Sequence, residues 1–324
     1  MSFWQQTKLM NIANSVINPA TADNQTNATQ KTQIVDGSGN VISSQGNHLS
    51  VAAKLIDEAG VAYGVKHINN KPRVSSMPYL FDIAEGNVPD HEEFERFGFN
   101  GDIDSGTTED IWPNGGTFVN IAAQAGLEIL SSSANDIDTT GTGIRTVTLY
   151  YLDNTFAEKT EVIAMNGTGV VATVATDIYR VQSLRAKTVG STGAAVGTIT
   201  LRNLADTPIY ATIEPLNTRS RNIFYTVPKD KVLYITSMTV GCISTTANNG
   251  VLLTLRATYD HLAMTNPGFF MPHAEFAIGS MISFQRMFEV PLFFPAGVDI
   301  SARASAIANN AQVSCALRGW QELA

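Results

Sequence analysis

The chain contains 324 residues, more than the roughly 250 to 300 residues at which a single hydrophobic core stops growing, so two packed units are expected. Hydrophobic residues make up 44% and charged residues only 15%, which leaves Thr, Ser, Asn, Gln and Gly to cover the surface. Together with 25 Gly and 12 Pro, this composition favours a β-rich protein with frequent turns. It excludes coiled coils, collagen and bulk disorder.

Membrane insertion and a disulfide framework are not expected. The longest apolar runs, such as residues 170–174, fall far short of the ~20 residues that span a bilayer. The first 19 residues lack the basic segment and continuous apolar run of a signal peptide. The two cysteines, Cys242 and Cys315, lie in apolar, strand-like runs, which predicts two buried free thiols.

The net charge of −8 is concentrated in one segment. Residues 82–110 carry ten acidic side chains and one basic side chain, Arg96, so the segment alone has a charge of −9 and the rest of the chain +1. Since no basic stripe elsewhere could neutralise several phosphates, nucleic acid is not an expected partner. We expect the acidic segment to be a solvated loop or a surface complementary to a basic partner.

An amphipathic helix is predicted at residues 3–17. Ser2 and Gln5 form a capping-box pattern, apolar residues recur at three- and four-residue spacing, and Pro19 ends the pattern. The polar tract that follows, up to residue 30, has little to bury and is expected to be an extended arm. So short a helix needs a surface, either on its own body or on another subunit or protein. The candidate assembly residues are Trp4, Leu9, Ile12, Val16 and Ile17.

Residues 33–43 have the pattern of a β-hairpin, with two apolar runs on either side of turn residues. Asp36, Ser38 and Asn40 match the opening of a calcium loop. The bidentate Glu of the twelfth position is missing, so no metal site is expected there. Residues 50–59, stopped by Gly60, are predicted to form a short helix.

Strand-like runs separated by turn clusters dominate from residue 112 onward. A first set is predicted at residues 127–131, 146–152, 161–164, 170–174, 178–186, 197–201 and 209–213. A second set, after a polar break at residues 216–221, is predicted at 223–227, 232–243, 251–258, 282–290, 298–302 and 311–320.

The predicted fold is mainly β, with two antiparallel β-sandwich or jelly-roll-like domains and a small irregular N-terminal region containing a short helix. The predicted organisation is an N-terminal helix and extended arm at 1–30 and a mixed, partly irregular acidic region at 31–111. Two β-sandwich domains follow, at 112–216 and 217–324.

No residue pattern predicts catalysis, a cofactor or a metal. The five histidines, His48, His67, His91, His261 and His273, are scattered, and no second His follows His91 at the spacing of a zinc site. No phosphate-binding glycine loop and no serine elbow occur. Acid pairs exist, for example Asp102 with Asp104 or Glu92 with Glu95, and a calcium site from Asp102, Asp104 and Glu109 is the metal alternative.

Two arginines lie in strand-like runs near acidic residues. Arg145 and Arg180 are therefore expected to form cross-strand ion pairs, with Asp136, Glu161 or Asp177 as partners.

Several short motifs resemble a module of virion structural proteins of tailed bacteriophages. Residues 225–228, Tyr-Thr-Val-Pro, followed by 231–235, resemble a strand–turn–strand unit of such proteins, although Lys229 and Asp230 stand where a small turn residue is expected. Residues 18–21 resemble N-terminal pieces of phage tail and neck proteins. The central motifs are at residues 131–136, 141–147, 151–153, 166–168, 178–180 and 197–200, and the resemblance covers about residues 112–235.

The resemblance implies a non-enzymatic component of a virion, at the neck or collar, in the tail or at a fibre attachment. It implies a homo-oligomer whose partners are other virion proteins, with no cofactor. The alternatives are a capsid decoration protein, or a receptor- or carbohydrate-binding module with a host receptor as partner. The second alternative requires exposed aromatic side chains on loops, for which the candidates are Trp112, Tyr259, Phe269 and Phe270.

Overall fold

A computed structural model describes residues 79–244, 250–260, 268–279 and 282–324, together with four two-residue strands nearer the N-terminus. The chain divides into two compact units, at residues 1–75 and 76–324. In the first unit, β1 (Leu55–Ile56) pairs with β2 (Ala62–Tyr63), and β3 (His67–Ile68) pairs with β4 (Lys71–Pro72). The prediction of a helix at 50–59 is therefore wrong at Leu55–Ile56, where local helix propensity gives way to strand pairing.

Three sequence predictions lie outside the described residues. They are the helix at 3–17 with its assembly residues Trp4, Leu9, Ile12, Val16 and Ile17, the extended arm to residue 30, and the hairpin at 33–43.

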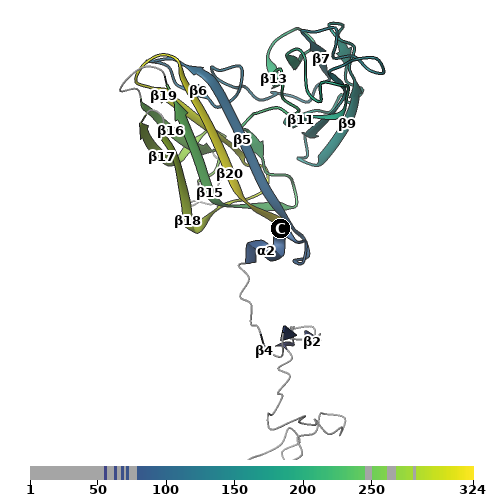
Figure 1. Cartoon of the computed structure of the whole chain (residues 1–324). Coiled ribbons are helices and arrows are strands. Elements are labelled where there is room, and N and C mark those ends of the chain that lie inside the picture. Colours follow the sequence, from purple (N-terminus) through teal and green to yellow (C-terminus); the bar gives the residue numbers. More distant parts are fainter. Residues whose placement is uncertain are drawn as a thin grey trace, which may run out of the picture. The chain divides into compact units, whose positions relative to one another are not determined.

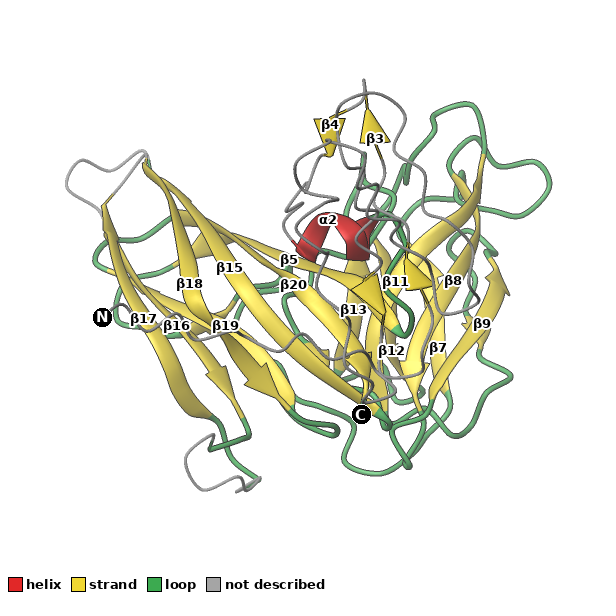
Figure 2. Cartoon of the chain, turned by 90° about the horizontal axis from the view of Figure 1, so that it is seen from below, coloured by secondary structure: helices red, strands yellow, loops and turns green. Residues whose placement is uncertain are grey.

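The second unit is mainly β and all of its strand pairs are antiparallel, as predicted (Figure 2). One short helix, α2 (Tyr79–Ala84), precedes the strands. The strands are β5 (His91–Ile103), β6 (Glu109–Asp110), β7 (Leu127–Ser131), β8 (Ile144–Leu152), β9 (Glu158–Ala164), β10 (Val171–Ala172), β11 (Arg180–Val189), β12 (Ile199–Asn203), β13 (Ile209–Ile213), β14 (Tyr225–Thr226), β15 (Lys231–Ile243), β16 (Gly250–Ala257), β17 (Met271–Gly279), β18 (Ile282–Phe294), β19 (Asp299–Ala306) and β20 (Ala311–Leu323).

Two sheets made of β5, β6 and β14–β20 form what we call the main lobe. One sheet has the strand order β18-β15-β20-β5, and its long strands run side by side in Figure 1. The other has the order β14-β19-β16-β17, with β6 also paired to β19. Inward-facing side chains of both sheets form one hydrophobic core, which includes Leu233, Val240, Leu253 and Phe294. This core is the reason for the alternating buried and exposed residues along β15 and β20.

The strands β7–β13 form a second body, which we call the inserted lobe because its sequence lies between β6 and β14 of the main lobe. Its two sheets have the orders β10-β7-β12-β13 and β11-β8-β9. They enclose a separate core that includes Leu127, Ile144, Leu149 and Ile199, all fully buried. Each lobe therefore has its own core.

Most predicted strands are confirmed, and β7 and β13 have the predicted bounds. The largest difference is in the acidic stretch, where the prediction of a solvated loop is wrong for β5 and β6. The 13 residues of β5 pair with β20 from His91 opposite Glu322 to Ile103 opposite Ala311. Alternation along β5 buries Phe94 and Asn100 and exposes Glu93 and Glu95, so a strand accommodates this charge.

The same stretch contains a buried ion pair. Asp110 in β6 is fully buried, and its carboxylate lies 2.6 Å from Nη2 of Arg256 in β16. The strands β5 and β6 precede residue 112 yet pair with strands from the 217–324 segment, because these pairings complete both main-lobe sheets. The remaining domain limits stay predictions.

Gly98 allows the chain that leaves the inserted lobe to cross β5 closely. A Cβ atom at this position would lie 2.4 Å from the carbonyl oxygen of Ile111 and 2.8 Å from Cβ of Ile223. The backbone hydrogen bond from Phe99 N–H to the carbonyl of Arg221 forms beside it, at 3.1 Å. Only glycine fits this contact without displacing backbone.

Both predicted thiols are buried and free. Burial raises the pKa of Cys242 and of Cys315, so both thiols stay protonated at neutral pH. Among the described residues, no helix has the length and hydropathy that a membrane span requires.

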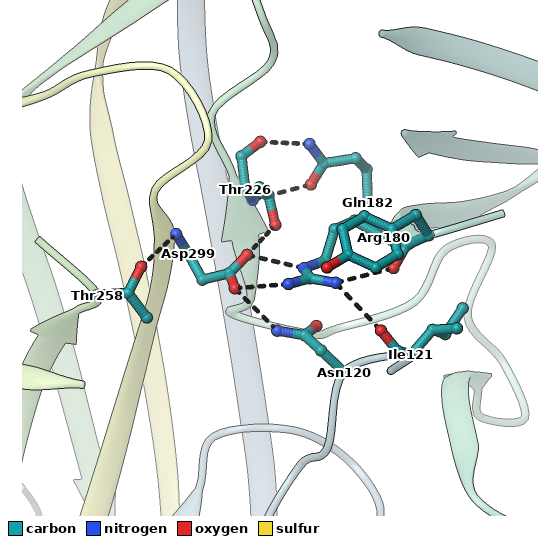
Figure 3. A network of polar contacts seen from close by, with 8 residues as sticks. Asn120, Ile121, Arg180, Gln182, Thr226, Thr258 and Asp299 are labelled. Atoms are coloured by element: carbon teal, nitrogen blue, oxygen red, sulfur yellow. Dashed lines mark hydrogen bonds and ion pairs between the residues drawn. The ribbon is translucent and has the colours of Figure 1, made fainter. Parts of the chain in front are cut away.

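A polar network joins the two lobes (Figure 3). Arg180 of β11 forms a bidentate pair with Asp299 of β19, with Nε to Oδ1 at 3.0 Å and Nη2 to Oδ2 at 3.1 Å. Asp299 also accepts hydrogen bonds from Thr226 and Asn120. Gln182 exchanges two hydrogen bonds with the backbone of Thr226. These contacts couple the lobes at a site from which most water is excluded.

The predicted cross-strand partners of the two arginines are therefore wrong. Arg180 pairs with the other lobe, and Nε of Arg145 donates to the carbonyl of Gly141 at 2.9 Å. The predicted partner Asp136 instead accepts four hydrogen bonds inside its own lobe, and Glu161 accepts from two backbone N–H groups.

Candidate functional site

A pocket with a volume of about 440 Å³ lies between the two lobes of the second unit. The main lobe contributes side chains from β5, β14 and β20, and the inserted lobe contributes side chains from β8, β9 and β11. The lining residues are Glu93, Phe94, Glu95, Arg96, Tyr150, Tyr151, Glu158, Lys159, Thr160, Gln182, Ser183, Arg185, Tyr225 and Gln321.

Arg96 is the central cation of this pocket. Its guanidinium carbon lies 4.9 Å from the centre of the Tyr225 ring, and its Nε is buried without a hydrogen-bond partner among the described residues. Burial is the main cause that lowers the pKa of Arg96 to about 10; Tyr225 opposes this shift, and repulsion from Arg185 and Arg219 adds to it. Arg96 remains charged at neutral pH, in a setting that disfavours its charge.

Two other arginines complete what we call the arginine cluster, which consists of Arg96, Arg185 and Arg219. A β-bridge places Arg185 opposite Arg219, which brings their charges together. Arg185 lies over the ring of Tyr150 at 5.1 Å, and Arg219 lies over the ring of Phe97 at 3.9 Å. Burial lowers the pKa of Arg219, opposed by Glu95 and assisted by Arg185.

The two buried phenols of the pocket remain protonated at neutral pH. Tyr225 donates to Oε1 of Gln321 at 2.7 Å, and burial raises the pKa of Tyr225. Tyr151 donates to Asp177 at 3.1 Å, and burial together with this carboxylate raises the pKa of Tyr151 to about 12. Neither phenol can therefore act as a phenolate base, although both offer polar groups to a ligand.

Most charges at the rim of the pocket are already paired. Lys159 lies 2.5 Å from Asp177 and 3.1 Å from Asp153. Lys231 lies 2.8 Å from Glu158 and 2.9 Å from Glu92, and hydrogen bonds from Lys231 and Gln321 lower the pKa of Glu92. Arg318 lies 3.1 Å from Glu95. These pairs set the charge at the rim, and Arg96 and Arg185 are the members of the arginine cluster that line the pocket.

The residues considered for catalysis or metal binding are held in separate structural contacts. Among the described residues, no three His, Cys, Asp or Glu side chains are placed to hold a metal ion. His91 lies 2.6 Å from Glu322, and His273 contacts the carbonyl of Tyr259. Of the predicted calcium set, Glu109 accepts from the N–H of Gly116 at 2.8 Å, which uses its carboxylate in a turn.

The aromatic candidates for a carbohydrate-binding surface are mostly not available. Trp112 and Tyr259 are core residues, with 5% and 1% of their surface exposed, so the prediction that they are exposed is wrong. Phe270 lies under the guanidinium of Arg256, at 4.1 Å. Phe269 is 63% exposed and is the one of the four candidates that meets the expectation.

Comparisons with known proteins give no family. No family model matches the chain, and no curated protein matches it. Among solved structures, the T13 particle of infectious bursal disease virus aligns with a TM-score of 0.18 and 9% identity, covering 76% of this chain and 79% of that chain. The VP2 subviral particle of the same virus aligns with a TM-score of 0.17 and 10% identity, covering 76% and 82%. TM-scores this low show neither a shared fold nor a shared function.

Sequence reasoning did not find this pocket. Its residues come from six strands that are far apart in the chain, and pairing across the lobes cannot be read from local patterns. The signal that was present is Arg96, the one basic residue in the acidic stretch. A single basic residue among ten acidic residues is a candidate for a binding site.

Proposed function

We propose that the protein is a non-enzymatic structural component of a virion that assembles with copies of itself and with other virion proteins. Within that class we propose a tailed-phage component at the neck or collar, in the tail or at a fibre attachment, built from two sandwich-like lobes. The motifs given above support the phage assignment. The predicted helix with Trp4, Leu9, Ile12, Val16 and Ile17 is proposed as one of its docking segments.

The observation that carries the proposal is the edge strand β18. Among the described strands, β18 pairs with β15 alone, so its other edge presents unpaired backbone groups. Apolar side chains on this strand are exposed, with Ile282 at 51%, Met287 at 58% and Val290 at 80%. Charge, proline or a covering segment usually protects such edges; β18 contains Arg286, Glu289 and Pro291, but residues 282–285 carry neither charge nor proline.

The position of β18 explains why this surface favours assembly. Phe284 and Ile282 lie opposite Val240 and Cys242, two core residues of β15, so they are on the core-facing side of the sheet. Phe284 meets Phe276 of the other sheet, with ring centroids 5.6 Å apart, but remains 38% exposed. A second copy that paired with this edge would bury apolar surface and satisfy backbone hydrogen bonds together.

Light scattering during size-exclusion chromatography tests the proposal. We expect a mass that is a multiple of the 34.8 kDa chain, and expect Val290→Lys and Ile282→Lys to shift it toward the monomer. Val174→Lys is the matched control, because Val174 is 89% exposed in the inserted lobe and should leave the mass unchanged. A wild-type monomer at all concentrations would contradict assembly. Absence of the chain from gradient-purified particles would contradict the virion assignment.

A further inference from the structure

We propose that the pocket between the lobes binds a carboxylate-bearing sugar, with the carboxylate held between Arg96 and Arg185. This site is independent of the assembly surface on β18, which lies on a different edge of the main lobe.

The first observation is that no described carboxylate forms an ion pair with the arginine cluster. Three partly buried arginines elsewhere, Arg180, Arg202 and Arg256, each lie within 4.0 Å of a carboxylate. Among the described residues, Arg96 has a tyrosine ring beneath it and a buried Nε with no acceptor. Because the Arg96 side chain lines the pocket without a carboxylate partner among the described residues, an anion bound there would supply the missing opposite charge.

The second observation is mutual repulsion within the cluster. Arg185 and Arg219 both disfavour the charge on Arg96, and the β-bridge between them fixes their proximity. An anion placed between Arg96 and Arg185 turns this repulsion into two attractions, because each cation then faces an opposite charge at short range. A bound anion would therefore stabilise the two arginine charges, which repel each other in the empty pocket.

The balance of charges in the pocket selects a singly charged ligand. At its rim, Lys159 lies against two carboxylates and Lys231 against two others, so each of these groups carries one net negative charge, while Arg318 neutralises Glu95. The other charged residues that line the pocket are Arg96, Arg185 and Glu93, and Glu93 forms no ion pair with another described residue. Two positive charges lie close together within otherwise acidic surroundings, and those acids repel a phosphate with two charges more strongly than a carboxylate with one. A carboxylate is also planar and matches the guanidinium fork.

The rest of the pocket suits a polyhydroxylated body. A volume of about 440 Å³ is far larger than a bare ion and falls in the range of small-molecule sites. Glu93 offers acceptor oxygens to hydroxyl donors, and Thr160 and Ser183 offer hydroxyl groups. The ring of Tyr150 is 37% exposed and provides an apolar face. A fatty acid, in contrast, would leave these polar groups unpaired.

Isothermal titration calorimetry with D-glucuronate as the probe tests this site in the full-length protein. Glucose is the matched uncharged ligand, and N-acetylglutamate amide presents the same carboxylate on a peptide-like body. The variants are Arg185→Gln, which changes an exposed side chain and should not affect folding, and Arg96→Gln. Lys229→Gln removes one positive charge at an exposed turn outside the pocket and is the control.

We expect millimolar or tighter binding of glucuronate, no measurable binding of glucose, and at least about tenfold weaker binding by each arginine variant. The Lys229→Gln variant should bind like the wild type. Absence of glucuronate binding to folded wild-type protein, or equal binding by wild type and Arg185→Gln, would overturn the site. If N-acetylglutamate amide binds as tightly as glucuronate, the carboxylate assignment holds and the sugar assignment is wrong.

Discussion

The two lobes of the second unit are stabilised in different ways. The main lobe contains four strands of 13 residues, β5, β15, β18 and β20, whose long registers hold one sheet together. The inserted lobe has strands of only 2 to 10 residues, and three of its strands have five residues each. Short strands supply few ladder hydrogen bonds, so other contacts must fix the turns between them.

In the inserted lobe, a buried carboxylate fixes the turns between the short strands. Asp136 is fully buried and accepts hydrogen bonds from Ser131 Oγ, from the N–H groups of Ile144 and Gly197 at 2.7 to 2.8 Å, and from Val196 N–H at 3.0 Å. It thus ties the end of β7 to the starts of β8 and β12. Long paired strands therefore stabilise the main lobe, whereas the hydrogen bonds of one buried carboxylate stabilise the inserted lobe.

Removing that centre should have the largest effect on stability. Asp136→Ala leaves three backbone N–H groups and a hydroxyl buried without an acceptor, and we expect a loss of about 4 kcal/mol in the unfolding free energy of the inserted lobe. Circular dichroism should show an early transition, while fluorescence of Trp112 and Trp320 reports the main lobe. Asp138→Ala, at an exposed position, should cost less than about 0.5 kcal/mol. A single unchanged transition in Asp136→Ala would refute the polar-centre account.

Gly98→Ala tests the main lobe in the same experiment. The added Cβ would meet the Ile111 carbonyl at 2.4 Å, so we expect a loss of about 3 kcal/mol, detected by tryptophan fluorescence. Gly101→Ala lies on the same strand and meets only the Phe99 ring, at 3.3 Å. Equal stability of the two variants would show that the crossing at Gly98 is not tight.

Coupling between the lobes should respond to Arg180→Met. Loss of this cation leaves Asp299 with its neutral partners Thr226 and Asn120 and should cost about 2 kcal/mol, less than for a fully buried pair. We expect the transitions seen by circular dichroism and fluorescence to separate. Arg202→Met breaks an ion pair to Glu128 inside the inserted lobe, and it should leave the fluorescence transition where it is in the wild type. Coincident transitions in Arg180→Met would argue against the coupling role.

The smallest expected effect is a pH dependence that arises in the inserted lobe. Burial acts to raise the pKa of Asp153, but hydrogen bonds from Thr155 and Ala157 and the nearby Lys159 hold that pKa below its ordinary value. The folded state therefore takes up this proton less readily than the unfolded chain. Asp153 stabilises the fold above about pH 4, and this contribution is lost as the pH falls below that value. Asp153→Asn should flatten the dependence of unfolding free energy on pH below about pH 4. An unchanged slope would show that Asp153 does not contribute.

Local patterns predicted the fold better than the pocket. Strand alternation and turn residues correctly indicated β7, β13 and most of β15 and β20, because these strands bury one face or both. The same reasoning missed β5, whose acidic residues suggested a solvated loop. A strand can expose charge on one face while Phe94 and Asn100 enter the core on the other, and only pairing with β20 reveals this.

Long-range partners account for the remaining errors. Arg180 was expected to pair with acids nearby in sequence, but Asp299, which is 119 residues away, satisfies it. Trp112 and Tyr259 were candidates for an exposed aromatic surface, but both are core residues. The arginine cluster likewise depends on the meeting of β5 with β11 and the connection before β14. None of these contacts has a local sequence signature.

Hydrogen exchange along β18 is the direct test of self-assembly through this edge. The account predicts that amides of residues 282–290 exchange more slowly at protein concentrations where scattering shows the oligomer than where it shows the monomer, and that Val290→Lys abolishes this difference. Strand β20, which lies inside the same sheet between β15 and β5, should be equally protected in both states. An oligomer in which the β18 amides exchange as fast as in the monomer would contradict the account.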